Sequence, residues 1–276
     1  MKHIVSVGIL LVSWITAVAW SQAGPFKEQQ LEDAVRPFVF DAKPGMPLTQ
    51  ELLDHVKLVS RPNLPIHDLT GLEKCSSVTT IYLSGTQIMD LTPLSKLSKL
   101  EQLTIAGGKI QDLIPLAGLT HLNYLELSGN EISDLKPLAS LKTLETLDLS
   151  SNKIADLTPL AGLTALRSLK LNGNQIGDLA PLAGLKSLTS LELNNNRIRD
   201  LTPLAGLTEC RFLELDRNQI ADLGPLAAMV RTYQETKRLP PSWMISVRGN
   251  PLSAQSRSRD LPDLEKNALY VTADNK

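Results

Sequence analysis

The stretch LETLDLSSNKIADLTPLAGLTA, from Leu144 to Ala165, decides the fold of this 276-residue chain. Its pattern of leucine, asparagine, aspartate and proline recurs before and after it with a period of about 22 residues. One column of the repeat contains Asn130, Asn152, Asn174, Asn196, Asn218 and Asn250. A second column contains Asp90, Asp112, Asp134, Asp156, Asp178, Asp200 and Asp222, and a third contains Pro93, Pro115, Pro137, Pro159, Pro181, Pro203 and Pro225. The chain is therefore an array of equivalent units.

Each unit contains a short strand with one buried face. Leu147 and Leu149 alternate with Thr146, Asp148 and Ser150, which is the period-two pattern of a half-buried strand. One such strand cannot close a core by itself, so each unit must bury its leucines against the units on either side. The pattern predicts a solenoid with a parallel sheet along its inner wall.

The asparagine and aspartate columns have structural explanations. Asn152 stands where the chain leaves the strand, and its amide can both donate to and accept from backbone groups of the turn. Asp156 comes three residues before Pro159, and we expect it to cap a short helical turn whose first N–H groups lack internal partners. We therefore interpret the six asparagines as a structural ladder and not as a site.

Residues 1–23 differ from the rest of the chain. A basic start precedes an apolar run that ends at Trp20. Small residues at the end of this run and just after it offer two signal-peptidase cleavage sites, one after Ala19 and one after Ala23. We expect a signal peptide over residues 1–23, cleaved after Ala23. The mature protein would then be exported, whether secreted, periplasmic or envelope-associated. The alternative is an uncleaved membrane anchor, because the run is near the lower length limit for a span.

Composition and motifs argue against several function classes. The formal net charge is −1, which gives no electrostatic footprint for nucleic acid or an anionic membrane. Outside residues 1–23 the histidines are His55, His67 and His121, and they show no metal-ligand spacing. Glycine-rich phosphate loops, nucleophile elbows and HExxH motifs are missing. We expect a non-enzyme, a monomer, with no catalytic residue, metal or cofactor.

The two cysteines are not expected to form a disulfide. Cys75 and Cys210 both occupy columns otherwise filled by leucine, about six repeats apart. With strands about 4.8 Å apart, that separation is roughly 30 Å, whereas a disulfide needs Cα atoms within about 7 Å. Each cysteine is interpreted as a small buried hydrophobe.

Helical segments flank the repeats. FKEQQLEDAVRPFVF and PLTQELLDHVKLV predict two helices, the second capped by Thr49. Such a cap would cover the first strand's leucines and hydrogen-bonding edge. After Leu226 the outer segment lengthens by about ten residues relative to the period. It predicts a longer solvated helix that ends at Pro240 and Pro241. A strand then returns near Trp243, and a helical cap and a loose tail are expected to follow.

The motif N-x-I-x-D-L-x-P-L-A-G-L, present as NKIADLTPLAGL and NRIRDLTPLAGL, resembles the leucine-rich repeats of bacterial internalins. It is also similar to repeats in a regulatory subunit of protein phosphatase 1. The resemblance implies an α/β solenoid, namely a right-handed leucine-rich-repeat superhelix with a parallel concave sheet, short 3-10 or helical convex turns and helical caps. It also implies protein binding through the concave sheet. The chain lacks the LPxTG sorting signal of surface-anchored members, so we carry over no host receptor.

The expected organisation is a signal peptide (1–23), an N-terminal helical cap (24–63), leucine-rich repeats (64–252) and a C-terminal cap and tail (253–276). Because the exposed strand positions have no scaffold role, they are the candidate site. Aromatic residues among them are candidate anchors, and the rest are polar with an acidic bias relieved by one lysine. The candidate residues are Tyr82, Tyr124, Glu126, Asp148, Lys170, Glu192, Phe212 and Glu214.

The sequence favours a rigid, non-catalytic scaffold that binds a protein partner of basic character. Two alternatives remain open. The first is a structural or envelope-associated protein without a discrete ligand, whose exposed strand residues are ordinary solvated side chains. The second is an enzyme-regulatory binding protein of the phosphatase-regulator type.

Overall fold

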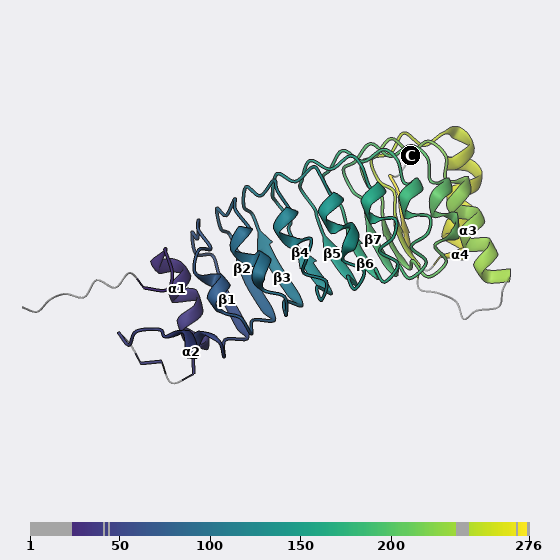
Figure 1. Cartoon of the computed structure of the whole chain (residues 1–276). Coiled ribbons are helices and arrows are strands. Elements are labelled where there is room, and N and C mark those ends of the chain that lie inside the picture. Colours follow the sequence, from purple (N-terminus) through teal and green to yellow (C-terminus); the bar gives the residue numbers. More distant parts are fainter. Residues whose placement is uncertain (1–23, 41, 44, 236–242, 269, 275–276) are drawn as a thin grey trace, which may run out of the picture.

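The computed structural model describes residues 24–40, 42–43, 45–235, 243–268 and 270–274, so the expected signal peptide lies outside the described part. The described residues form a ten-stranded parallel sheet in which β1 to β10 follow one another in chain order. Figure 1 shows the strands side by side along the molecule, with α1 at one end and α3 and α4 at the other. The predicted solenoid with a parallel sheet is confirmed.

Equivalent positions of successive units pair in the sheet, as Leu125 with Leu147 and Leu147 with Leu169. The repeat therefore fixes the register, and the leucines between the outward positions are fully buried. The strands are β1 (Leu58–Pro62), β2 (Thr80–Ser84), β3 (Gln102–Ala106), β4 (Tyr124–Glu126), β5 (Thr146–Asp148), β6 (Ser168–Lys170), β7 (Ser190–Glu192), β8 (Phe212–Glu214), β9 (Met244–Ser246) and β10 (Tyr270–Thr272).

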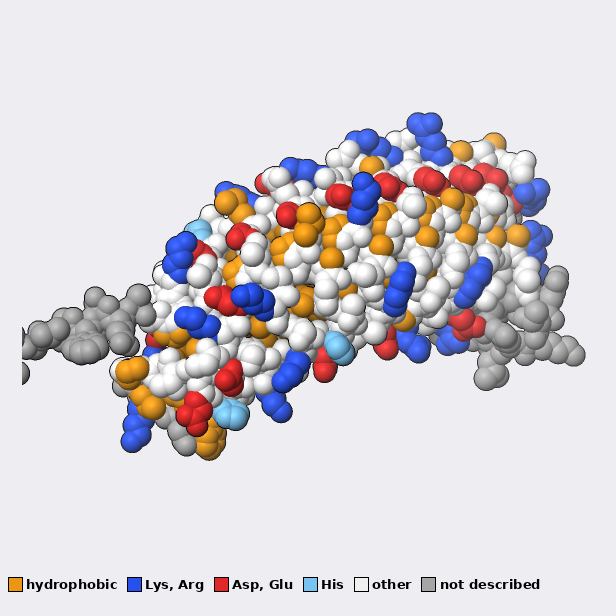
Figure 2. Space-filling model, viewed as in Figure 1, with side chains coloured by type: hydrophobic (Ala, Val, Ile, Leu, Met, Phe, Trp, Pro, Cys, Tyr) orange, Lys and Arg blue, Asp and Glu red, His pale blue; other side chains and the backbone are white. Residues whose placement is uncertain are grey.

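Short 3-10 turns form the opposite wall of the solenoid. The predicted role of the aspartate column is confirmed, because Asp156 Oδ1 accepts a hydrogen bond from Thr158 N at 2.8 Å. The aspartates themselves are exposed, and Figure 2 shows acidic side chains in a row along this face. The turns are η2 (Leu72–Lys74), η3 (Thr92–Lys96), η4 (Ile114–Leu116), η5 (Lys136–Ser140), η6 (Thr158–Leu160), η7 (Ala180–Leu182) and η8 (Thr202–Gly206).

The asparagine ladder is buried and fully hydrogen-bonded. Asn152 Nδ2 donates to Leu127 O at 2.9 Å and Leu149 O at 3.0 Å, and its Oδ1 accepts from Ile132 N at 3.0 Å. The ladder is interrupted at its N-terminal end. Thr86 Oγ1 is buried without a hydrogen-bond partner, and Gly108 has no side chain. Each asparagine thus joins neighbouring units, which explains why the residue recurs.

The N-terminal cap contains α1 (Gln29–Val35), a 3-10 turn η1 (Arg36–Phe38) and α2 (Gln50–Leu53). Thr49 caps α2 as predicted, since its Oγ1 accepts from Leu52 N at 3.4 Å. β1 lies inside the segment 24–63 that the sequence assigned to the cap. The sheet therefore begins before residue 64. β1 lacks the L-x-L pattern of the later strands, and Val59 is its only buried residue.

The C-terminal end also differs from the expectation. α3 (Gly224–Glu235) is partly buried, not solvated, because Leu226, Met229 and Val230 face the core and the helix contacts α4 (Leu261–Asn267). The prolines expected to end it lie outside the described residues. A π-helical turn η9, Ser256–Asp260, precedes α4. The tail was expected to be loose after Val271. This is wrong at Thr272, which belongs to β10 and pairs with Ser246 of β9.

The candidate partner-binding face

Two rows of side chains cover the outward face of the sheet, and the pairing register confirms the predicted columns. β1 and β10 extend both rows. The first row contains Leu58, Thr80, Gln102, Tyr124, Thr146, Ser168, Ser190, Phe212, Met244 and Tyr270. The second row contains Ser60, Tyr82, Thr104, Glu126, Asp148, Lys170, Glu192, Glu214, Ser246 and Thr272.

A tyrosine cluster, made of Tyr82, Thr104, Tyr124 and Glu126, lies toward the N-terminal end of these rows. Tyr124 Oη donates to Glu126 Oε2 at 3.0 Å, and Thr104 Oγ1 is 3.4 Å from the same oxygen. Burial raises the pKa of Tyr124, and the nearby Glu126 and Tyr82 raise it further. The phenol is therefore neutral at physiological pH, and its hydrogen bond is used inside the cluster.

In the middle of the face an ion pair reduces the negative charge. Lys170 Nζ lies 3.2 Å from Glu192 Oε1, and Asn172 Nδ2 donates to Glu192 Oε2 at 2.8 Å. Burial works to lower the pKa of Lys170, but Glu192, Asp148 and Glu126 outweigh it, so the pKa is raised. Lys170 therefore remains a cation and balances Glu192.

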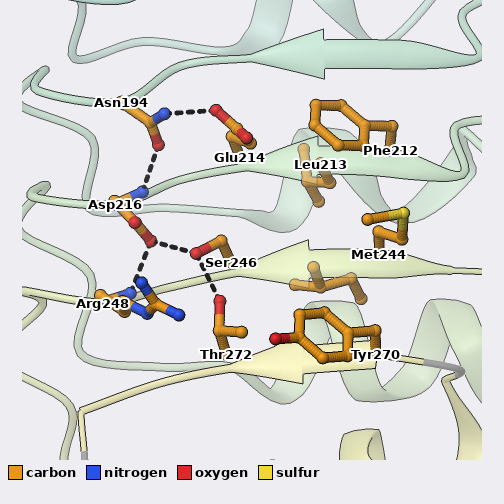
Figure 3. A pocket seen from close by; sticks show the side chains of 11 residues that line it. Asn194, Phe212, Leu213, Glu214, Asp216, Met244, Ser246, Arg248, Tyr270 and Thr272 are labelled. Carbon is orange, nitrogen blue, oxygen red and sulfur yellow. Dashed lines mark hydrogen bonds between the residues drawn. The ribbon is translucent and has the colours of Figure 1, made fainter.

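A hollow of about 250 Å³ lies over β8, β9 and β10; we call it the C-terminal hollow (Figure 3). Its floor is formed by Leu213 and Ile245, which belong to the core. Three columns surround this floor: Phe212, Met244 and Tyr270 from the first row; Glu214, Ser246 and Thr272 from the second; and Asn194, Asp216 and Arg248 just beyond the strands.

A chain of hydrogen bonds holds the polar side of the hollow. Asn194 Nδ2 donates to Glu214 Oε2, and Asn194 Oδ1 accepts from Asp216 N at 2.7 Å. Ser246 Oγ donates to Asp216 Oδ1 at 2.6 Å and lies 2.6 Å from Thr272 Oγ1. Because these bonds fix the side-chain rotamers, the polar side of the hollow is held in one arrangement (Figure 3).

The structure brings only two of the eight predicted site residues into the hollow, Phe212 and Glu214. The other six lie along the rows toward the tyrosine cluster. Sequence reasoning missed Tyr270, Asp216 and Arg248 as site residues. The available signal for Tyr270 was its alternation with Val271 and Thr272, which matches that of Phe212-Leu213-Glu214.

Other chemistries gain no support from the described part of the chain. Within it, no three histidine, cysteine, aspartate or glutamate side chains are grouped so that they could hold a metal ion. None of its helices is long and apolar enough to cross a membrane. Cys75 and Cys210 are free and buried, and burial raises the pKa of each thiol to about 12.

Comparisons with known proteins agree with this architecture. A family model described as leucine-rich repeats in two copies matches residues 120–162 and 164–206. No curated protein sequence matches at a significant level. A leucine-rich-repeat protein of Leptospira interrogans shares 24% identity with a TM-score of 0.70, over 81% of this chain and 56% of that one. At that identity the likeness shows the fold alone.

Two solved structures from Listeria monocytogenes are closer in sequence. An internalin (InlF) shares 30% identity with a TM-score of 0.69, over 91% of this chain and 78% of that chain. Internalin C2 also shares 30% identity, with a TM-score of 0.63, over 90% of this chain and 94% of that chain. Since both relatives are 30% identical and the similarity covers at least 90% of this chain and 78% of each relative, the chain belongs to the internalin family of leucine-rich-repeat proteins.

Proposed function

We propose that the chain is an exported, non-catalytic scaffold that binds a protein partner of basic character through the concave sheet face. The charge pattern of the face is the observation that carries this proposal. Carboxylates outnumber cations along the rows and in the C-terminal hollow: Glu126, Asp148, Glu192, Glu214 and Asp216 against Lys170 and Arg248. A surface of one predominant sign selects partners of the opposite sign and speeds their encounter.

The shape of the face supports the same proposal. Thr146, Ser168 and Ser190 occupy the middle of the first row. These short polar side chains separate the tyrosine cluster from the C-terminal hollow. Aromatic residues are enriched among interface hot spots, so each end of the face offers a candidate anchor. A partner that spans the face would contact both ends.

Affinity capture tests the proposal. The tagged full-length chain would be produced in its own cells and compared with a triple variant, Tyr82→Ala, Tyr124→Ala and Phe212→Ala. Ile114→Ala, an exposed residue of the 3-10 wall, serves as the matched control. We expect a partner that wild type and control retain, that the triple variant loses, and that high salt weakens.

Equal capture by all three proteins, or none by any, would contradict the proposal and favour a structural role without a discrete ligand. Circular dichroism of the triple variant must match wild type, so that lost capture reports the surface and not the fold. N-terminal sequencing tests export separately. A start at Gly24 or Trp20 supports it, whereas an intact Met1 on an intracellular protein would favour the enzyme-regulatory alternative.

A further inference from the structure

Glu192 and Glu214 are adjacent in the second row but have different surroundings. The Glu192 carboxylate pairs with Lys170 and accepts from Asn172. Glu214 accepts a hydrogen bond from Asn194, and among the described residues no cation lies within 4.0 Å of its carboxylate. Its neighbour on the far side is Ser246, which is neutral. Among the described residues, Glu214 is thus a carboxylate without a counter-ion in a preorganised hollow.

Asp216 adds a second negative charge at the same place. Its Oδ1 accepts from Ser246 Oγ at 2.6 Å and from Arg248 N at 2.7 Å, both neutral donors. Arg248 is the one cationic residue that lines the hollow, and within the described residues its guanidinium forms no ion pair. Two carboxylates against one unpaired cation leave the C-terminal hollow negative.

An apolar wall stands beside these carboxylates. Phe212, Met244 and Tyr270 lie in one column across three strands, with Met244 and Tyr270 exposed by 43% and 58% (Figure 3). A purely apolar ligand would cover this wall but would also desolvate Glu214 without supplying a charge, which is unfavourable. A ligand with an apolar stem and a cationic end satisfies both sides of the hollow.

We propose that the C-terminal hollow binds an arginine side chain of the protein partner. The methylene stem lies on Met244 between the rings of Phe212 and Tyr270, and the guanidinium faces Glu214, with Asp216 beyond it. Arginine fits better than lysine because its planar group can stack on a ring and form two parallel hydrogen bonds with a carboxylate. This inference rests on the proposed function and names the feature of the partner that the face recognises.

The methyl group of Met244 provides a direct test by NMR. The full-length chain would be labelled with methyl-¹³C methionine and titrated with Nα-acetyl-arginine amide, with the citrulline analogue, which is nearly isosteric and uncharged, and with Nα-acetyl-leucine amide. We expect a saturable shift of the Met244 signal, with arginine binding about fivefold tighter than citrulline. The Met89 and Met229 signals, from an exposed and a buried site elsewhere, should not move.

Three conservative variants sharpen the test. Glu214→Gln keeps an oxygen for Asn194 but removes the charge, so the preference for arginine over citrulline should disappear. Glu192→Gln is the matched control one strand away and should keep the preference. Arg248→Gln removes the competing cation and should tighten arginine binding, a change that a merely structural role for Arg248 would not produce.

Several results would overturn the assignment. Tighter binding of the leucine probe, no saturable shift of Met244 with the arginine probe, or an unchanged preference in Glu214→Gln would each do so. These outcomes are separate from those of the capture experiment. Partner capture that depends on the sheet face, combined with no Met244 response, would leave the proposed function standing and reject this subsite. A Met244 response to the arginine probe without any captured partner would support the arginine subsite and reject the proposed function.

Discussion

The two ends of the sheet face carry similar residue types but use them differently. In the tyrosine cluster, Tyr124 donates to Glu126 at 3.0 Å, so the aromatic residue and the carboxylate satisfy each other. In the C-terminal hollow, Phe212 and Met244 have no such donor, and Glu214 has no cation among the described residues. Aromatic residues beside carboxylates therefore do not identify a binding site by themselves. What distinguishes the hollow is charge and apolar surface that the chain leaves uncommitted.

The backbone beneath the two ends shows the opposite contrast. Under the tyrosine cluster the ladder is interrupted at Thr86 and Gly108, whereas from Asn130 onward each turn has its asparagine. Asn218 and Asn250, near the hollow, donate to Leu193 O and Leu215 O at 2.9 Å. The hollow thus combines free side chains with a well-held backbone, which is the arrangement that lowers the entropic cost of binding.

The largest expected effect comes from breaking the ladder where it is complete. Asn174→Ala removes hydrogen bonds to Leu149 O at 3.0 Å, Leu171 O at 3.1 Å and Ile154 N at 3.0 Å. Because these groups are buried, we expect the free energy of unfolding to fall by about 3 kcal/mol or more. Urea denaturation measures this free energy of unfolding.

At the interrupted end of the ladder, Thr86→Val deletes an unpaired hydroxyl. It should leave the free energy of unfolding unchanged or raise it by about 1 kcal/mol, which the same urea denaturation measures.

The second prediction compares the two ends in binding. Once the capture experiment has identified the partner, Phe212→Ala with Tyr270→Ala should weaken its affinity by about 30-fold, the size of a hot spot. Tyr82→Ala should weaken it by less than about threefold, because Glu126, the carboxylate of the tyrosine cluster, already accepts a hydrogen bond from Tyr124. Isothermal titration calorimetry gives both values. A larger loss at Tyr82 than at the hollow would reverse the assignment of the main anchor.

The two cysteines report local opening at the two ends. Burial raises the pKa of Cys75 and Cys210 to about 12, so almost no thiolate exists at pH 8 and alkylation requires opening of the structure. We expect native-state alkylation with iodoacetamide, followed by mass spectrometry, to modify Cys75 about tenfold faster than Cys210. Equal rates for the two thiols would show that the interrupted ladder does not loosen its end.

The smallest effect concerns the N-terminal cap at low pH. Hydrogen bonds from Lys27 and Thr70 lower the pKa of Asp68 to about 2. The pKa of Glu28 is lowered as well, because hydrogen bonds from His67 and Asp68 outweigh the effect of burial. Since both values lie below those of unfolded chains, about 4, the stabilisation is present above pH 4 and is lost as the pH falls toward 2.

Thermal unfolding between pH 5 and pH 2 checks this prediction. Asp68→Asn should flatten the acid limb of the stability profile, whereas Asp134→Asn, on the exposed aspartate column, should leave it nearly unchanged. The change should be modest because Lys27, the ion-pair partner of Asp68, is exposed and solvent screens the pair. An acid limb that is identical in Asp68→Asn and wild type would show that this contact does not stabilise the cap.

Sequence patterns predicted the repeating part of the molecule well because each unit creates nearly the same environment. Alternation around Leu147 and Leu149 was enough to place β5, and the fixed period then placed β2 to β8 and the outward rows. β9 follows an outer segment that is longer by about ten residues, and the return of the strand pattern near Trp243 placed it. The terminal strands escaped this reasoning. β1 and β10 contain a single inward-facing apolar residue each, Val59 and Val271, and they join the sheet because a neighbouring strand offers unpaired backbone groups.

The sequence by itself determined the fold, the register and which residues face outward, because a repeat of fixed length leaves each leucine only one buried direction. The C-terminal hollow was decided by tertiary structure alone. Its walls come from β8, β9 and β10, which α3 and α4 separate along the chain. Its polar side depends on hydrogen bonds that Asp216 N donates to Asn194 and that Ser246 Oγ donates to Asp216. The 22-residue period relates Asn194 to Asp216, but it does not relate Asp216 to Ser246 or Ser246 to Thr272. Only the assembly of these residues in space shows that Glu214 has no counter-ion among the described residues.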